Sequence, residues 1–218
     1  MTAAFGPDPR ADLGATVASL LRSSGHADLA AIVDRSQIER CPSAETWQLG
    51  DRAVTAERFG LVVASEDYVR LDRDPEGLSA LRSAFASAVR SFETELTSLD
   101  LFLAVGSSGR SWASAYRSVP VAVSLEPEPE AVRGAAIALA EAYGRAWAEN
   151  VLQRSTFDVA PVPYAETSLR RWVVRLVAAD FVDLDQKPER RAQLEAMITA
   201  AAASPTTRVG EIVFGARA

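Results

Sequence analysis

Lysine, histidine and cysteine are almost missing from this sequence of 218 residues. Lys187 is the only lysine, His26 the only histidine and Cys41 the only cysteine. A single cysteine excludes an intramolecular disulfide and a metal cluster built on cysteines. Catalytic triads and thiol nucleophiles need a basic partner, and one histidine makes both improbable. We therefore expect no metal, no cofactor and no catalytic residue of these kinds.

Long apolar runs are missing as well. None approaches the roughly 18 residues that a membrane-spanning helix needs. The N-terminus, MTAAFGPDPRADLG, has no charged segment followed by an apolar one and does not resemble a signal peptide. Its glycine and prolines predict a loose lead-in over residues 1–9. We expect a cytoplasmic protein that makes no contact with a membrane.

The charge is acidic, with a formal net charge of −6. A negative chain is a poor match for a phosphate backbone, so nucleic-acid binding is disfavoured. Hydrophobic residues make up 48% and charged residues 24%, which is an ordinary globular composition. The strong preference for arginine over lysine indicates a GC-rich bacterial genome. The alternative explanation is selection for arginine side chains that make bidentate contacts with anions.

A segment of the chain returns later in the sequence. Residues 58–76, RFGLVVASEDYVRLDRDPE, match residues 171–189, RWVVRLVAADFVDLDQKPE, at a constant offset of 113. Seven of the 19 positions are identical. Coincidence in a chain rich in alanine, valine, arginine and aspartate is the alternative. We interpret the match as an internal repeat over residues 45–106 and 157–215, within a single domain over residues 10–218.

Helical spacing of apolar residues predicts several helices. A helical hairpin is expected before Cys41, broken at Gly25 and His26. In the repeat, Leu169, Trp172, Val173, Leu176 and Val177 favour a helix in both copies. The matching run over residues 61–64 fits a buried strand equally well. Short extended pieces are expected at residues 68–71 and 181–184, and one long helix at residues 129–154.

Proline and acidic residues mark the next elements. Asp-x-x-Pro-Glu occurs in both copies and predicts helices that begin at Pro75 and Pro188, with Asp72, Asp74 and Asp185 as possible caps. Each helix leads into an apolar strand, at residues 99–105 and 209–214. Further strands are expected at residues 119–125 and 157–162, and a small hairpin at residues 45–54. Strands and helices do not alternate regularly, so we predict an α+β fold with helices packed on a mixed or antiparallel sheet.

The best candidate for a binding site follows the first of these apolar strands. It is a loop rich in glycine and serine, which precedes a short expected helix at residues 112–117. Such a turn can hold an anion with backbone N–H groups, hydroxyls and a guanidinium. A plain loop between antiparallel strands is the alternative, because the Walker and nucleophile-elbow patterns are absent. The loop consists of Gly106, Ser107, Ser108, Gly109, Arg110 and Ser111.

Four aspartates of the repeat, Asp67, Asp72, Asp180 and Asp185, form two symmetric pairs in the sequence. Paired carboxylates can hold a cation or share a proton. Helix capping and solvation explain them more simply. His26 is expected to be a loop or cap residue rather than a general base.

Two kinds of function remain open. The first is a non-catalytic protein-interaction or assembly protein, which binds a partner protein or a second copy of itself through an apolar helix face or a strand edge. The second is a small-molecule enzyme or sensor that holds an anionic ligand at residues 106–111. The shortage of histidine, cysteine and lysine favours the first.

Overall fold

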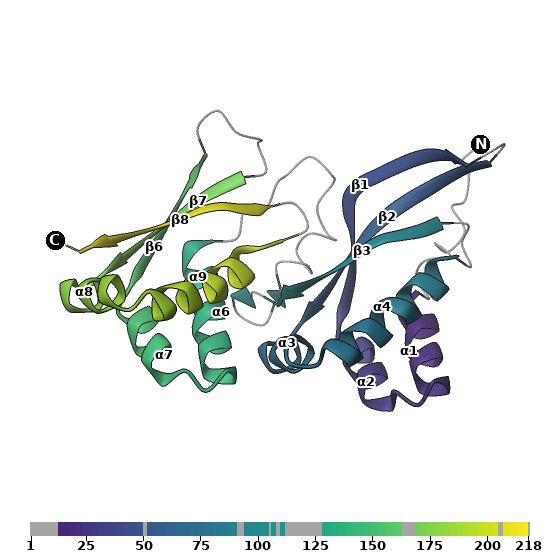
Figure 1. Cartoon of the computed structure of the whole chain (residues 1–218), viewed down its shortest axis with the longest axis horizontal. Helices are drawn as coiled ribbons and strands as arrows, with labels where there is room; N and C mark the ends of the chain where they lie inside the picture. Colours follow the sequence, from purple (N-terminus) through teal and green to yellow (C-terminus); the bar gives the residue numbers. More distant parts are fainter. Residues whose placement is uncertain are drawn as a thin grey trace. The chain divides into compact units, whose positions relative to one another are not determined.

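The computed structural model describes residues 13–49, 52–90, 94–104, 106–107, 110–111, 128–162, 169–204 and 207–217 (Figure 1). The chain divides into two compact units. Unit 1 comprises Met1–Val63 and Arg70–Leu101, and unit 2 comprises Ala64–Val69 and Phe102–Ala218. The lead-in over residues 1–9, the strand expected at residues 119–125 and the helix expected at residues 112–117 lie outside the described residues.

The first run of elements begins with two helices and ends with a strand. In chain order it contains α1 (Leu13–Ser23), α2 (Ala27–Arg35), β1 (Gln37–Leu49), β2 (Arg52–Val63), α3 (Ser65–Asp72), α4 (Pro75–Arg90) and β3 (Thr94–Leu103). Two very short strands follow, β4 (Gly106–Ser107) and β5 (Arg110–Ser111).

The second run repeats the same order of helices and strands. It contains α6 (Pro129–Ala142), α7 (Ala146–Gln153), β6 (Thr156–Pro161), β7 (Leu169–Leu176), α8 (Ala178–Gln186), α9 (Pro188–Ala202) and β8 (Arg208–Ala216). The residues that match in sequence therefore occupy the same elements, with β2 matching β7, α3 matching α8 and α4 matching α9.

Each run builds one three-stranded sheet, in the orders β1-β2-β3 and β6-β7-β8. Strands β1 and β2 are antiparallel, as are β6 and β7, whereas β7 and β8 are parallel. Within each unit the helices gather on one face of the sheet (Figure 1). The predicted α+β fold is confirmed.

The helix predicted at the start of the repeat is wrong in both copies. Arg58 lies in β2, and the stripe from Leu169 to Leu176 forms β7. Trp172, Val174 and Leu176 are buried while the residues between them are more accessible, which is the period of two that a strand requires. Hydrogen bonding to strands on both sides outweighs the helical spacing that the apolar residues also satisfy.

Three further boundaries differ from the expectation. Residues 68–71 and 181–184 are not extended but lie in α3 and α8. The single helix expected at residues 129–154 is two helices, because Gly144 adopts a positive φ of 68° and ends the first. Apolar residues at helical spacing beyond Pro75 predict a helix that reaches Leu96, but α4 stops at Arg90 and Leu96 belongs to β3.

Other expectations are confirmed. The first two helices form a hairpin, and Gly25 turns the chain between them with a φ of 86°. Helices α4 and α9 begin at the two predicted prolines. Strand β8 contains the strand predicted at residues 209–214, and β3 and β6 overlap those predicted at residues 99–105 and 157–162. Asp74 caps α4, since its Oδ1 accepts the Gly77 N–H at 2.9 Å. Of the hairpin expected at residues 45–54, the described residues pair as part of the longer β1–β2 ladder, with Leu49 opposite Arg52.

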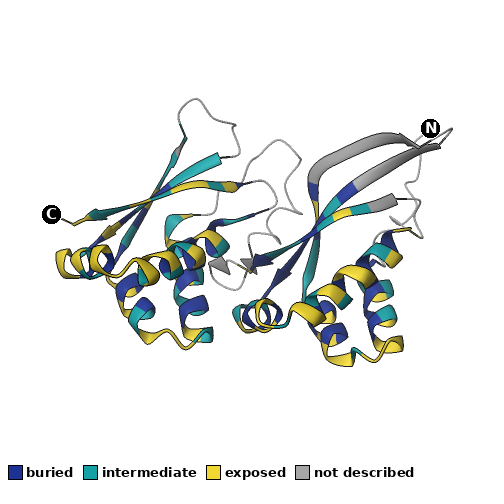
Figure 2. Ribbon diagram, viewed as in Figure 1, coloured by how far each residue is buried: buried dark blue, intermediate teal, exposed yellow. Residues whose placement is uncertain are grey.

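In each unit buried residues occur on both the helices and the sheet (Figure 2). Among the largest fully buried ones in unit 1 are Leu21, Ile32, Leu61, Leu81 and Phe85. In unit 2 they include Leu139, Leu152, Trp172, Leu176 and Leu194. No helix in the described part of the chain is long and apolar enough to cross a membrane.

Candidate functional site

The loop predicted to bind an anion contains a small β-hairpin. Gly106 pairs with Ser111, and Ser107 pairs with Arg110, in antiparallel register. Ser108 and Gly109, which connect the two strands, lie outside the described residues. The backbone pairing does not reveal how the side chains are placed, so the anion site at this hairpin stays a prediction.

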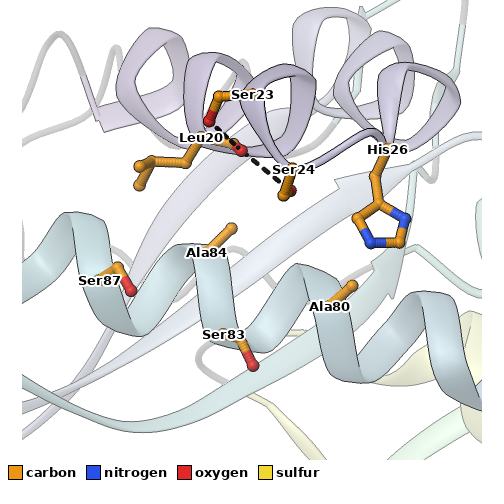
Figure 3. Close-up of a pocket in the computed structure, with 8 residues that line it drawn as sticks. All are labelled: Leu20, Ser23, Ser24, His26, Ala80, Ser83, Ala84 and Ser87. Carbon is orange, nitrogen blue, oxygen red and sulfur yellow. Dashed lines mark hydrogen bonds between the residues drawn. The ribbon is translucent and has the colours of Figure 1, made fainter.

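A groove of about 370 Å³ lies in unit 1 between α4 and the α1–α2 turn (Figure 3). Small side chains on α4 form one wall, and Leu20 of α1 forms part of the other. Sequence reasoning missed this groove, because its two walls lie far apart in the chain. The residues that line it are Leu20, Ser23, Ser24, His26, Ala80, Ser83, Ala84 and Ser87.

Three serines of this groove are already engaged in hydrogen bonds. Ser23 and Ser24 donate their hydroxyls to the carbonyl of Leu20 at 2.8 and 3.0 Å, and Ser83 donates to Ser79 at 2.9 Å. His26 occupies the N-cap position of α2 but makes no side-chain capping hydrogen bond. A nucleophile must be hydrogen-bonded to its base, and no serine here is paired with His26 in this way.

A second groove, of about 470 Å³, lies on another side of α4, between that helix and β3. Five consecutive residues of β3, Leu96 to Asp100, line one side. Ser79, Arg82, Ser83 and Ala86 of α4 line the other, at the i, i+3, i+4 and i+7 spacing of one helical face. Consecutive strand residues point to opposite faces of a sheet, so a groove that touches all five runs along the strand's edge.

An ion pair holds β3 to the middle strand at this groove. Arg58 donates from Nη2 to Asp100 Oδ2 at 2.5 Å and from Nε to Ser98 Oγ at 3.1 Å. The hydrogen bond to Asp100 raises the pKa of the Arg58 guanidinium above its ordinary value, although burial opposes the shift. Thr97 adds a hydrogen bond to the carbonyl of Glu57 at 3.1 Å. These contacts join β3 to β2, and the groove lies between β3 and α4.

Cys41 lies directly opposite Arg58 in the β1–β2 register and is buried. Burial raises the pKa of its thiol to about 11; Arg58 lowers it somewhat, while Asp100 and Glu39 raise it further. The reactive form of cysteine is the thiolate. The only thiol in the chain is therefore a structural group.

Cys41 is expected to resist alkylation in the native protein. At pH 8 a thiol with a pKa of about 11 is roughly 0.1% thiolate, against about a quarter for an exposed cysteine. Labelling with a chromogenic disulfide should be about two orders of magnitude slower than for a free thiol. The same reagent should react at once in denaturant, and equally rapid labelling without denaturant would contradict the assignment.

The repeated aspartates do not form acid pairs. Asp180 in α8 receives two hydrogen bonds from Arg154, at 2.9 and 3.2 Å, and is buried. Asp67, its match in α3, is buried too, whereas Asp72 and Asp185 are exposed. Asp185 does not cap α9, whose N-cap position is held by Lys187. Among the described residues no cluster of histidine, cysteine, aspartate and glutamate could hold a metal ion.

In unit 2 the sheet has a face that carries charge and a little apolar surface. Arg171 pairs with Glu211 at 2.6 Å, and Arg175 pairs with Asp158 at 3.2 Å, across neighbouring strands. Between these pairs Val173 of β7 lies beside Val213 of β8, which is 36% exposed. Arg171 and Arg175 are thus engaged in ion pairs, and Trp172 lies in the core.

Comparison with known proteins assigns the chain to no family. No protein-family model matches the chain, and no curated protein matches it at a significant level. The grooves and the strand edges are therefore the features that bear on its role.

Proposed function

We propose that this chain is a non-catalytic protein-interaction or assembly protein, which binds a partner chain or a second copy of itself. The observation that carries the proposal is the edge strand β8. It runs for nine residues at the end of the unit 2 sheet, and β7 is its only strand partner among the described residues. Most of its side chains are exposed or half-buried. An edge strand offers a row of backbone N–H and C=O groups to an incoming strand.

The side chains of β8 do little to discourage such pairing. Natural edge strands are protected by lysine, proline or inward-pointing charges. β8 contains neither lysine nor proline, and Glu211 is neutralised by Arg171. Exposed Val213 and its neighbour Val173 add apolar contact beside the edge.

A lysine on β8 tests the proposal. We expect the native protein to form a defined oligomer or a stoichiometric complex, measured by light scattering and by capture on the immobilised chain. Val213→Lys should weaken that association by about tenfold or more, because a charged side chain blocks edge pairing. Val182→Lys is the matched control, since Val182 is 52% exposed but lies on α8. A monomer at every concentration with no captured partner would contradict the proposal.

A further inference from the structure

The edge strand β3 of unit 1 has a groove beside it. β3 ends the sheet order β1-β2-β3, and α4 forms the opposite wall of the 470 Å³ groove. Five strand residues at a rise of about 3.3 Å span about 13 Å, the length of four or five residues of an extended peptide. The floor is apolar where Ala86, Leu96 and Leu99 line it. This geometry accepts an extended chain that adds a strand to the sheet.

One charge in the groove is available for recognition. Arg82 projects from α4 into the lining and makes no ion pair with any residue that the structure describes. The other charged lining residue, Asp100, is held by Arg58 at 2.5 Å. A guanidinium without a partner, flanked by Ser79 and Ser83, suits a carboxylate better than any other peptide side chain.

In unit 2 the matching helix, α9, contacts its edge strand, β8, through an arginine side chain. At the positions that match Leu78 and Arg82, α9 carries Arg191 and Glu195, which are hydrogen-bonded to each other at 3.1 Å. Arg191 also lies over the ring of Phe214 in β8, 5.5 Å from its centre. Helix and edge strand are thus tied together there. In unit 1 the corresponding positions carry Leu78 and Arg82, so this arginine–glutamate bridge is absent and Arg82 stands where unit 2 has a glutamate.

We propose that the groove between α4 and β3 binds an extended peptide segment that carries an acidic side chain, with Arg82 as its anchor. The backbone of the segment pairs with the free edge of Leu96–Asp100, and its carboxylate meets the Arg82 guanidinium. The proposal deepens the proposed function and rests on it, since it names a second surface and the chemistry of its partner. It is independent of strand β8, which lies in the other unit.

The test uses two short peptides, acetyl-VTETV-amide and acetyl-VTKTV-amide, titrated into the isotope-labelled full chain. Because the charged residue is central in both peptides, it takes the same position whether the peptide pairs parallel or antiparallel to β3. We expect saturable amide-shift changes that are confined to Ser79–Ala86 and Leu96–Asp100. The acidic peptide should bind at least about fivefold more tightly than the basic one. A version of the acidic peptide with N-methylated amides should lose binding, because strand addition depends on backbone hydrogen bonds.

Charge reversal at the anchor decides the outcome. Arg82→Glu should invert the preference, so that the lysine peptide becomes the tighter ligand. Arg90→Glu is the control, because Arg90 is exposed on the same helix and does not line the groove. Equal binding of both peptides, or no shift changes at the groove, would overturn the proposal. If that happens while Val213→Lys still disrupts an assembly, the groove is refuted and the proposed function stands.

Discussion

Replacing Trp172 with alanine is expected to lower the free energy of unfolding of unit 2 by about 3–5 kcal/mol. Trp172 is the largest fully buried side chain among the described residues, with 0% of its surface exposed. It lies on the middle strand β7, between Val159 of β6 and Ile212 of β8, and belongs to the core of unit 2. The loss combines apolar surface returned to water with a cavity that three packed strands and their helices cannot close.

Phenylalanine at the same position should be far better tolerated. The indole Nε1 of Trp172 is buried and has no hydrogen-bond partner among the described residues, so its removal relieves a desolvated donor. Position 59, the match of Trp172 in β2, already carries a buried phenylalanine. We therefore expect Trp172→Phe to cost no more than about 1.5 kcal/mol.

Denaturant unfolding followed by far-UV circular dichroism measures both variants, since the signal does not depend on the replaced tryptophan. Phe59→Ala is the matched experiment in unit 1 and should destabilise that unit instead. Equal losses for the phenylalanine and alanine variants would mean that the indole N–H has a partner after all. A loss below about 1 kcal/mol for Trp172→Ala would contradict its place in the core.

The fold class and the best-marked helices could be predicted from the sequence. Pro75 and Pro188 follow aspartates and precede glutamates, and that local chemistry is sufficient to start a helix wherever it occurs. Strands β3 and β8 were predictable for a similar reason, because each is a short apolar run bounded by turn residues. Such signals are contained within a few neighbouring residues.

The strands β2 and β7 could not be predicted in this way. β7 is apolar on its inner face, and the valine and leucine among its other residues complete a helical spacing by chance. This segment is a strand because it pairs with β6 and β8, which are distant from it in the sequence. Tertiary pairing overrides local preference most easily in short apolar runs.

The groove between α4 and β3 could not be predicted from the sequence either, and the reason is geometric. Its walls come from α4 and from β3, and neither carries a motif of its own. In the sequence, Arg82 and Ser83 belong to the polar face of a predicted helix, and such a face usually contacts water. Only the position of the strand edge beside that face distinguishes a groove from a solvated surface.

Removing the carboxylate of Asp180 is the second change with a large expected effect. Arg154 follows α7 and contacts Asp180 through both Nε and Nη2, so the pair ties the end of α7 to the first turn of α8. Asp180 is only 9% exposed, whereas the Arg154 side chain is 55% exposed. Breaking a fully buried pair costs about 3–5 kcal/mol, and solvent access to the arginine reduces that to about 2 kcal/mol here.

A double-mutant cycle separates the ion pair from the burial of either partner. Asp180→Ala and Arg154→Ala should each destabilise unit 2, and the double variant should be less harmful than the sum of the two. Asp183→Ala on the same helix is the control, because Asp183 pairs with Lys187 and Arg190 at the exposed surface and should change stability little. Additive losses would show that the pair contributes nothing. A large coupling would establish that the repeated aspartate is an architectural group, and that its buried match Asp67 calls for a structural explanation before a catalytic one.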